Sequence, residues 1–161
     1  MKKSIKNIAT LVKERKNLSI LKTYNSGLLQ AKAYRLLKSY ISLTLKKYGI
    51  STVEWALIGQ LYEVKSVTIT EAAKILDVEK PFATNLAETL RKKGFVKRLV
   101  DKDDRRSKRI SLTDKGNMQV PVIESDVRGA MSKILNEVSV EDIFSYVKVL
   151  EEIVKNTSKR I

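Results

Sequence analysis

The stretch from residue 70 to residue 113 constrains the fold more strongly than any other part of this 161-residue chain. Its hydrophobic residues recur at helical spacing in two successive segments, then alternate along two short segments on either side of a charged loop. This order predicts two helices joined by a tight turn and followed by a two-stranded hairpin. The predicted elements are helices at Thr70–Leu76 and about Lys80–Lys93, strands at Phe95–Val100 and Lys108–Leu112, and the loop Asp101–Ser107.

The second helix of this stretch has clear ends and two different faces. Pro81 fits a first helical turn, where its missing N–H is not needed, and Gly94 fits the position just after a helix. Amide and hydroxyl groups on the outward face can contact base edges or phosphates, although an ordinary solvent-facing helix gives the same pattern. The predicted inward stripe is Ala83, Leu86, Ala87 and Leu90, and the outward face is Pro81, Asn85, Glu88 and Lys92, flanked by Thr84 and Thr89.

The predicted hairpin carries a dense group of charges at its tip. Arg105 and Arg106 follow three acidic residues, and we expect Asp104 to orient one of the arginines. A flat guanidinium on a narrow ribbon suits the minor groove of DNA, where the potential is most negative. The alternative is an ordinary solvated turn. Along the second strand, alternation predicts inward side chains at Ile110 and Leu112 and outward side chains at Arg109 and Ser111.

The hairpin and the residues around it resemble the wing signature of the MarR family of bacterial and archaeal transcription regulators. The segments that carry the resemblance are Gly94–Arg98, Asp101–Arg106 and Ile110–Gly116, and the layout is similar from about Leu21 to Val154. The resemblance implies a mainly α fold with a small β-hairpin wing. It further implies a winged helix-turn-helix DNA-binding domain at residues 49–113 and a helical dimerisation region built from residues 1–48 and 114–161.

The same resemblance implies roles for individual residues. In the family, the wing arginine that matches Arg106 reaches the minor groove, and an aspartate that matches Asp104 braces it. Glu79 stands where many members have a serine helix cap, and Asn85 stands where a basic residue is common, so the base preference is expected to differ. Together with the outward face of the helix, the predicted DNA-binding residues are Pro81, Phe82, Thr84, Asn85, Glu88, Lys92, Asp104, Arg105 and Arg106.

Cysteine and histidine are both absent from the sequence. Their absence excludes disulfides, thiolate redox sensors, Cys/His metal sites and the Ser-His-Asp and Cys-His catalytic arrangements. The acidic residues are scattered and suggest no converging catalytic pair. We therefore expect no enzymatic activity, no metal site and no cofactor.

The formal net charge of +14 is concentrated in two parts of the chain. Residues 1–48 hold 12 basic and 1 acidic residue, and residues 77–113 hold 11 and 6, whereas residues 114–161 hold 7 and 8. This distribution favours a polyanion as partner, with an anionic membrane surface as the second choice. Residues 1–20 are interpreted as a solubilising tail, with extra phosphate contacts as the alternative. No apolar run is long enough to cross a membrane, and we expect a cytoplasmic protein without a membrane partner.

Long helices are predicted on both sides of the central stretch. Leu21–Tyr48 has two apolar stripes, and a helix with this pattern must be buried on two sides. Thr113 caps a helix that continues to about Asn136 through Pro121, which is expected to kink it or to interrupt one hydrogen bond. Ser139 begins a last helix with a single apolar stripe. The first and last of these helices indicate a dimer interface.

A shorter helix and a strand are predicted before the central stretch. Ser51 and Glu54 form a capping-box pattern, and the helix runs to about Tyr62. Trp55 is interpreted as a packing residue or as part of a cavity lining. Val67–Ile69 is a strand candidate that would pair with the hairpin, and Thr70 is the predicted cap of the next helix.

These observations predict a homodimeric, sequence-specific transcription regulator, acting as a repressor on a pseudo-palindromic site in double-stranded DNA. The resemblance implies release by a small anionic aromatic ligand. Lys32, Arg35 and Trp55 are the candidate ligand-binding residues, because cations beside an aromatic ring suit a phenolic carboxylate, although each cation alone also fits a side chain that snorkels to water. The alternative function is a constitutive architectural DNA-binding protein without a small-molecule effector.

Overall fold

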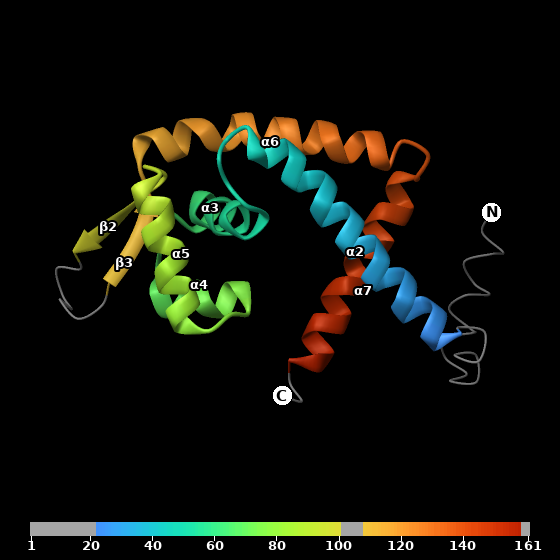
Figure 1. Cartoon of the computed structure of the whole chain (residues 1–161). Helices are drawn as coiled ribbons and strands as arrows, with labels where there is room; N and C mark the ends of the chain where they lie inside the picture. The colour runs from blue at the N-terminus through green and yellow to red at the C-terminus, as the bar shows by residue number, and fades with distance from the viewer. Residues whose placement is uncertain (1–21, 101–107, 159–161) are drawn as a thin grey trace. The chain divides into compact units, whose positions relative to one another are not determined.

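The computed structural model describes residues 22–100 and 108–158 of the chain (Figure 1). The predictions for residues 1–20 and for Asp104, Arg105 and Arg106 lie outside the described residues. The chain divides into two compact units, Met1–Thr52 and Val53–Ile161, which are described separately below. The elements in order are α2 (Thr23–Lys46), α3 (Thr52–Val64), β1 (Ser66–Thr68), α4 (Ile69–Leu76), α5 (Lys80–Lys92), β2 (Val96–Val100), β3 (Lys108–Leu112), α6 (Asp114–Ile134) and α7 (Val140–Thr157).

The described part of the first unit is dominated by the long helix α2, close to the range that the sequence predicts. Only Leu45 is buried among the residues of this helix. The large apolar side chains of its two stripes are mostly exposed, and six of them exceed 60% exposure: Tyr24, Leu28, Leu29, Tyr34, Leu36 and Leu43. An apolar surface this extensive on one helix is typical of an interaction surface rather than of a solvated helix.

The second unit contains a three-stranded antiparallel sheet in the order β1-β3-β2. The predicted pairing with the hairpin is confirmed for Val67 and Thr68, which pair with Ile110 and Arg109, whereas Ile69 belongs to α4 and not to the strand. The inward prediction for Ile110 and Leu112 is also confirmed, because both are nearly inaccessible to solvent. The outward prediction for Ser111 is wrong. Ser111 is buried because β3 is the central strand, flanked by Ser66 on one side and Lys97 on the other.

Helices α4 and α5 follow β1 with the tight connection that the sequence predicts. The predicted cap at Thr70 is wrong, because α4 begins at Ile69 and Thr68 is its N-cap. The Thr68 hydroxyl accepts a hydrogen bond from the Glu71 backbone N–H at 3.1 Å, and the Glu71 carboxylate accepts one from the Thr68 N–H at 2.7 Å. This reciprocal pair is a capping box, which satisfies two free donors at once. Asp77 then ends α4 in the left-handed conformation, with φ of 50°.

The predicted faces and ends of α5 are confirmed. Its inward stripe packs into the core of the second unit, where it joins buried side chains of α3, the sheet and α6. Gly94 follows the helix with φ of 78°, and the next residue, Phe95, donates its backbone N–H to the Leu90 carbonyl at 3.0 Å. This bond belongs to a helix ending that favours glycine in the left-handed region. The core residues contributed by α5 are Ala83, Leu86, Ala87 and Leu90.

Helix α6 leaves the sheet through a sharp corner. The Thr113 hydroxyl caps it by accepting a hydrogen bond from the Gly116 N–H at 3.0 Å. Gly116 lies so close to the Phe95 carbonyl that an added Cβ would collide with it. Pro121 lies inside α6, which nevertheless continues as one helix to Ile134.

The last helix, α7, is capped by Ser139 as predicted. None of its residues is buried. Its predicted apolar stripe is largely open to solvent, with Phe144 72% exposed and Val154 63% exposed. Within the described residues, no helix combines the length and the apolar character that a membrane span requires.

Candidate nucleic-acid interface

The outward face of α5 presents short uncharged side chains at its start. Pro81, Thr84 and Asn85 are exposed, and Phe82 is 47% exposed rather than packed in the core. Glu79 is the N-cap but makes no side-chain capping bond, so the first backbone N–H groups of α5 receive no side-chain acceptor from the cap residue. Exposed amides, methyl groups and a helix N-terminus are suited to contacts with bases and phosphates.

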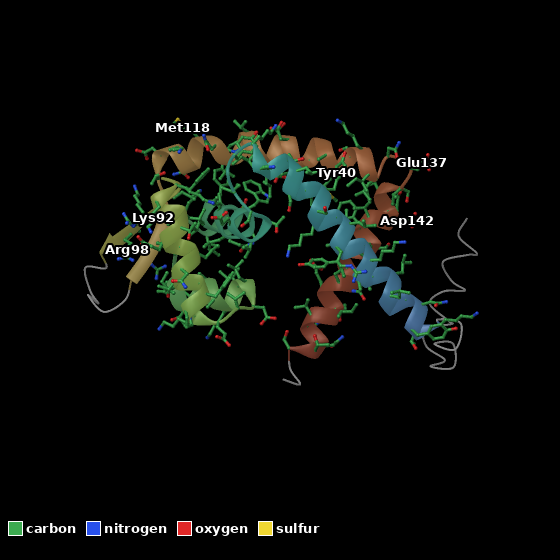
Figure 2. The ribbon with its side chains drawn as sticks, viewed as in Figure 1. Tyr40, Lys92, Arg98, Met118, Glu137 and Asp142 are labelled. Carbon is green, nitrogen blue, oxygen red and sulfur yellow. The ribbon has the colours of Figure 1, made fainter. Side chains whose placement is uncertain are left out.

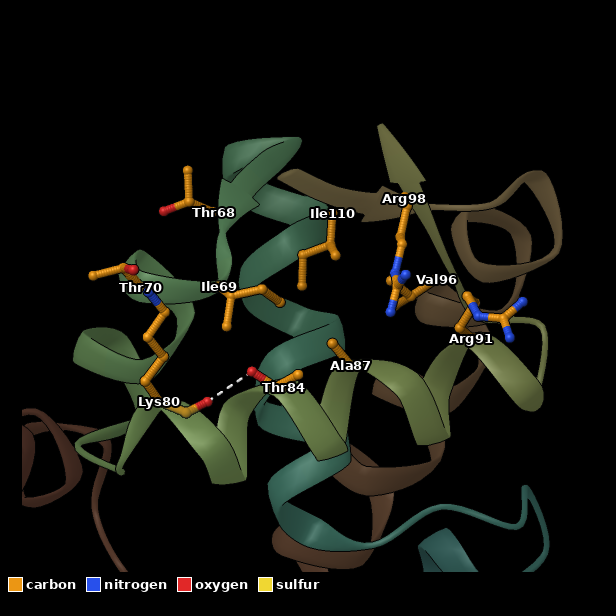
Figure 3. Close-up of a pocket in the computed structure, with 10 residues that line it drawn as sticks. All are labelled: Thr68, Ile69, Thr70, Lys80, Thr84, Ala87, Arg91, Val96, Arg98 and Ile110. Carbon is orange, nitrogen blue, oxygen red and sulfur yellow. Dashed lines mark hydrogen bonds between the residues drawn. The ribbon is translucent and has the colours of Figure 1, made fainter. Parts of the chain in front are cut away.

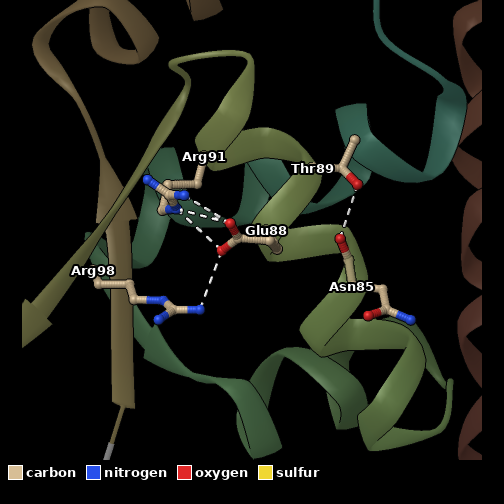
Figure 4. A network of polar contacts seen from close by, with 5 residues as sticks. All are labelled: Asn85, Glu88, Thr89, Arg91 and Arg98. Carbon is tan, nitrogen blue, oxygen red and sulfur yellow. Dashed lines mark hydrogen bonds and ion pairs between the residues drawn. The ribbon is translucent and has the colours of Figure 1, made fainter.

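The polar groups on this face are not equally available for a partner. Thr84 donates its hydroxyl proton to the Lys80 carbonyl at 2.9 Å, and Thr89 donates to the Asn85 carbonyl at 2.9 Å. The Asn85 side chain points away from the helix, and its amide has no hydrogen-bond partner within the described ranges (Figure 4). Asn85 therefore offers both a donor and an acceptor to a partner, which is the pattern that pairs with an adenine edge.

Glu88 differs from the other side chains on the outward face of α5, because both oxygens of its carboxylate accept hydrogen bonds from arginines. Arg91, one turn along the same helix, donates from Nε and Nη2 at 2.7 to 3.1 Å, and Arg98 on β2 donates from Nη2 at 3.1 Å (Figure 4). The hydrogen bonds from Arg91 hold the pKa of Glu88 below its ordinary value and raise the pKa of Arg91. One carboxylate therefore accepts hydrogen bonds from two guanidinium groups.

A hollow of about 350 Å³ lies between α5, the start of α4 and the sheet (Figure 3). Its floor is apolar and its rim carries hydroxyl and cationic groups. None of the described residues that line it is acidic. The polar lining residues are Thr68, Thr70, Thr84, Lys80, Arg91 and Arg98. This combination is suited to an oxyanion such as a phosphate group.

Further ion pairs and hydrogen bonds fix the interface to the rest of the second unit. Lys93, just after α5, donates to both oxygens of the buried Glu54 carboxylate on α3, at 2.6 and 2.9 Å. Arg109 on β3 donates to the Ser66 carbonyl at 3.0 Å and so joins the outer strand β1 to the centre of the sheet. These contacts hold α5 and the base of the hairpin in a defined orientation.

The predicted DNA-binding residues of α5 lie together on one helix, as expected from their spacing. Arg91 and Arg98 were not predicted, although both are exposed and adjacent to that face. The spacing of three residues between Glu88 and Arg91 was a readable signal for their pair. The sequence does not predict the contact between Glu88 and Arg98, because that contact depends on how α5 packs beside β2. Figure 2 shows the Lys92 and Arg98 side chains where this helix meets the strand.

The predicted ligand-binding residues fall in different units. Lys32 and Arg35 are exposed on α2 in the first unit. In the second unit, Trp55 lines a groove between α3 and α6 together with Pro121. Among the residues that the structure describes, no three acidic side chains cluster in a way that would hold a metal ion.

Comparisons with known proteins agree with this geometry. Residues 48–107 match the model of the MarR family. A MarR transcriptional regulator from Methanosarcina mazei Go1 is 22% identical, with a TM-score of 0.76 over 86% of this chain and 99% of that one. NadR in complex with 4-hydroxyphenylacetate is 25% identical, with a TM-score of 0.68 over 82% and 92%. Wild-type MarR from E. coli is 18% identical, with a TM-score of 0.67 over 80% and 95%.

The family resemblance of the wing signature is thus confirmed, and so is the mainly α winged helix fold. The family model covers the segment that contains α3, the helix-turn-helix and the first wing strand. Residues 48–107 thus match the MarR family model, and the chain shares the winged helix fold of the solved regulators.

Proposed function

We propose that this protein is a homodimeric, sequence-specific DNA-binding transcription regulator that acts in the cytoplasm as a repressor. The observation that carries the proposal is the exposed, mostly uncharged start of α5, which is bordered by cations and held rigidly on a MarR-type fold. A helix with this surface enters the major groove in winged helix proteins, and its side chains then read base edges.

In this proposal, α5 reads the sequence and cationic side chains grip the backbone. Asn85 is the principal base reader, and Pro81, Phe82 and Thr84 shape the contact with the groove. Lys92 contacts a phosphate. The wing residues Asp104, Arg105 and Arg106 would reach the minor groove beside it. Phosphate contacts supply most of the affinity and make it steeply dependent on salt.

The proposed dimer is supported by the exposed apolar faces of α2 and α7. Such faces are large for a single chain, and a second copy would cover them. Their charges are also complementary, because α2 holds four basic residues and no acidic residue, whereas α7 holds four acidic and two basic residues. We infer that residues 1–48 and 114–161 form the dimerisation region and that residues 49–113 form the DNA-binding domain. Two α5 helices would then enter successive major grooves.

A small anionic aromatic effector is the second part of the proposal. The similar protein NadR was solved in complex with 4-hydroxyphenylacetate, a phenolic carboxylate. In this chain, Trp55 lines a groove beside α6, and Lys32 and Arg35 are exposed cations that suit a carboxylate. We propose that these three residues bind such an effector and that its binding weakens the contact with DNA.

Selection from a pool of random duplex DNA, followed by sequencing and repeated at several salt concentrations, tests the proposal. A specific dimeric regulator is expected to enrich an inverted repeat with half-sites about one helical turn apart. Salt-sensitive binding without an enriched sequence would contradict the proposal that the protein recognises a specific operator. It would favour a constitutive architectural DNA-binding protein.

A further inference from the structure

We propose that Glu88 is a positioning residue, which holds Arg98 and Arg91 for contact with the DNA backbone and does not itself read a base. This inference rests on the proposed function and replaces the expected direct contact of Glu88 with DNA. It also makes Arg98, on the first strand of the wing, a DNA-contacting residue that the sequence did not reveal.

The first support is the occupancy of the Glu88 carboxylate. Oε1 accepts hydrogen bonds from Arg91 Nη2 at 2.7 Å and Nε at 3.1 Å. Oε2 accepts one from Arg91 Nε at 3.0 Å and one from Arg98 Nη2 at 3.1 Å. A carboxylate that reads cytosine must accept a hydrogen bond from the N4 amino group of the base. Glu88 would have to release an arginine to do so.

The second support is the exposure of the two arginines. The Arg98 side chain is 55% exposed and that of Arg91 is 49% exposed, whereas that of Glu88 is 31% exposed. Within the described residues, Arg98 donates only from Nη2 and only to Glu88, so none of its other N–H groups has a hydrogen-bond partner there. A guanidinium that is fixed by one edge presents its other donors in a defined direction, as recognition of a phosphate requires.

The third support is the charge around the network. Two hollows meet at Arg91 and Arg98, and Glu88 is the only acidic residue among the described residues that line either of them. Lys80 lines the first hollow and Lys97 the second. Without an anion between them, two guanidiniums this close would repel each other and turn apart. Glu88 therefore keeps a pair of cations together on a surface that would otherwise disperse them.

The network also joins two elements that must act together. Glu88 belongs to α5, and Arg98 belongs to β2 in the wing. An ion pair between them fixes where the backbone contact lies relative to the base-reading face. Glu88 would thus fix the position of the phosphate contact of Arg98 relative to the base contacts of α5, although Glu88 itself touches neither base nor phosphate.

A double-mutant cycle with Glu88→Gln and Arg98→Gln tests the inference. The affinity of the wild type, both single variants and the double variant for the selected duplex is measured at several salt concentrations. We expect Arg98→Gln to weaken binding evenly across sequences and to lower the salt slope by about one. In the Glu88→Gln background, the loss caused by Arg98→Gln should be smaller by roughly two- to fivefold, the coupling range of exposed ion pairs. The cycle cancels the direct repulsion between Glu88 and DNA.

Glu124→Gln is the matched control, because Glu124 pairs with Arg128 at 3.1 Å on α6 and the substitution changes the net charge equally. In that background, Arg98→Gln should cost as much affinity as in the wild type. Melting temperatures of all variants should stay close together, since exposed ion pairs contribute little to stability. The base preference selected by Glu88→Gln should equal that of the wild type.

Three results would overturn the inference while leaving the proposed function intact. An equal cost of Arg98→Gln in both backgrounds would show that the two residues act independently. A larger cost in the Glu88→Gln background would show that Glu88 withholds Arg98 from DNA. Loss of preference at one base pair in Glu88→Gln would make Glu88 a base reader. If the wild type itself bound no duplex DNA, the proposed function would fail first and the inference with it.

Discussion

At the scale of single residues, the corner between the wing and α6 depends on one glycine. Gly116 is helical, so its backbone does not require glycine, but its missing side chain leaves room for the Phe95 carbonyl. In the sequence, Gly116 is notable only as part of the wing signature. The packing reason was not readable, because it arises from the approach of a residue 21 positions away.

We predict that Gly116→Ala destabilises the protein by about 1–3 kcal/mol, the usual cost of forcing an extra group into a packed site. Gly129→Ala is the matched control, since Gly129 lies in the same helix with nothing near its Cβ position. That control should instead stabilise by roughly 0.5–1 kcal/mol, because alanine restricts the unfolded chain and favours a helix. Chemical denaturation measures both, and equal effects of the two substitutions would contradict the packing explanation.

The capping box of α4 gives a pH-dependent prediction. The hydrogen bond from the Thr68 backbone holds the pKa of Glu71 below its ordinary value of 4.5. The ionised form is therefore the one that the folded state favours, and its contribution is complete above pH 4.5 and is lost as pH falls through the lowered pKa. The difference in unfolding free energy between wild type and Glu71→Gln should be constant near neutral pH and should shrink below pH 4.5. A difference that stays constant to acid pH would argue against the capping role of the charge.

At the scale of elements, the sequence predicted what periodicity and local chemistry determine. The inward stripe of α5, the glycine after it and the two hairpin strands are all close to their predicted positions. The sequence did not predict contacts set by packing between elements. The pair of Glu54 with Lys93 joins residues 39 positions apart, and the buried Ser111 follows from the central place of β3. The cap of α4 was misplaced because Thr68 and Thr70 are both plausible caps, and only the reciprocal bond with Glu71 distinguishes them.

If α5 reads bases and the wing contacts the DNA backbone, substitutions in α5 should reduce base preference and substitutions in the wing should reduce affinity. Asn85→Ala should remove preference at one base pair of each half-site, at a cost of about 1–3 kcal/mol against the preferred base. Arg106→Ala should weaken binding evenly across sequences. Asn136→Ala, an equivalent change at an exposed position between α6 and α7, should alter neither property. Selection and sequencing with each variant would reveal the pattern, and an unchanged motif in Asn85→Ala would remove Asn85 from the reading face.

At the scale of the whole molecule, the exposed apolar surface of α2 and α7 needs an explanation. Phe144 on α7 is 72% exposed, and several large apolar side chains of α2 are exposed to a similar degree. Periodicity correctly showed that α2 has two apolar stripes, but a single chain does not show what covers them. A second copy is the proposed answer, and it makes dimerisation and DNA affinity inseparable.

Phe144→Asp should therefore give a monomer and strongly reduce DNA affinity, because a charge buried in an apolar interface without a partner is costly. Val64→Asp places the same charge at a position that is 50% exposed on α3, outside the proposed dimerisation region, and should leave the mass unchanged. Sedimentation equilibrium gives the mass in each case. A dimeric Phe144→Asp, or a monomeric wild type that still binds an inverted repeat tightly, would refute the proposed interface.

The most direct test of the central claim compares two duplexes at about 0.15 M salt, near physiological ionic strength. One carries the inverted repeat enriched by selection, and the other has the same bases in scrambled order. A specific regulator should bind the first at least ~10³-fold more tightly, as specific DNA-binding proteins do. Equal affinity for both duplexes would contradict sequence-specific regulation and leave a protein that binds DNA by charge and shape alone.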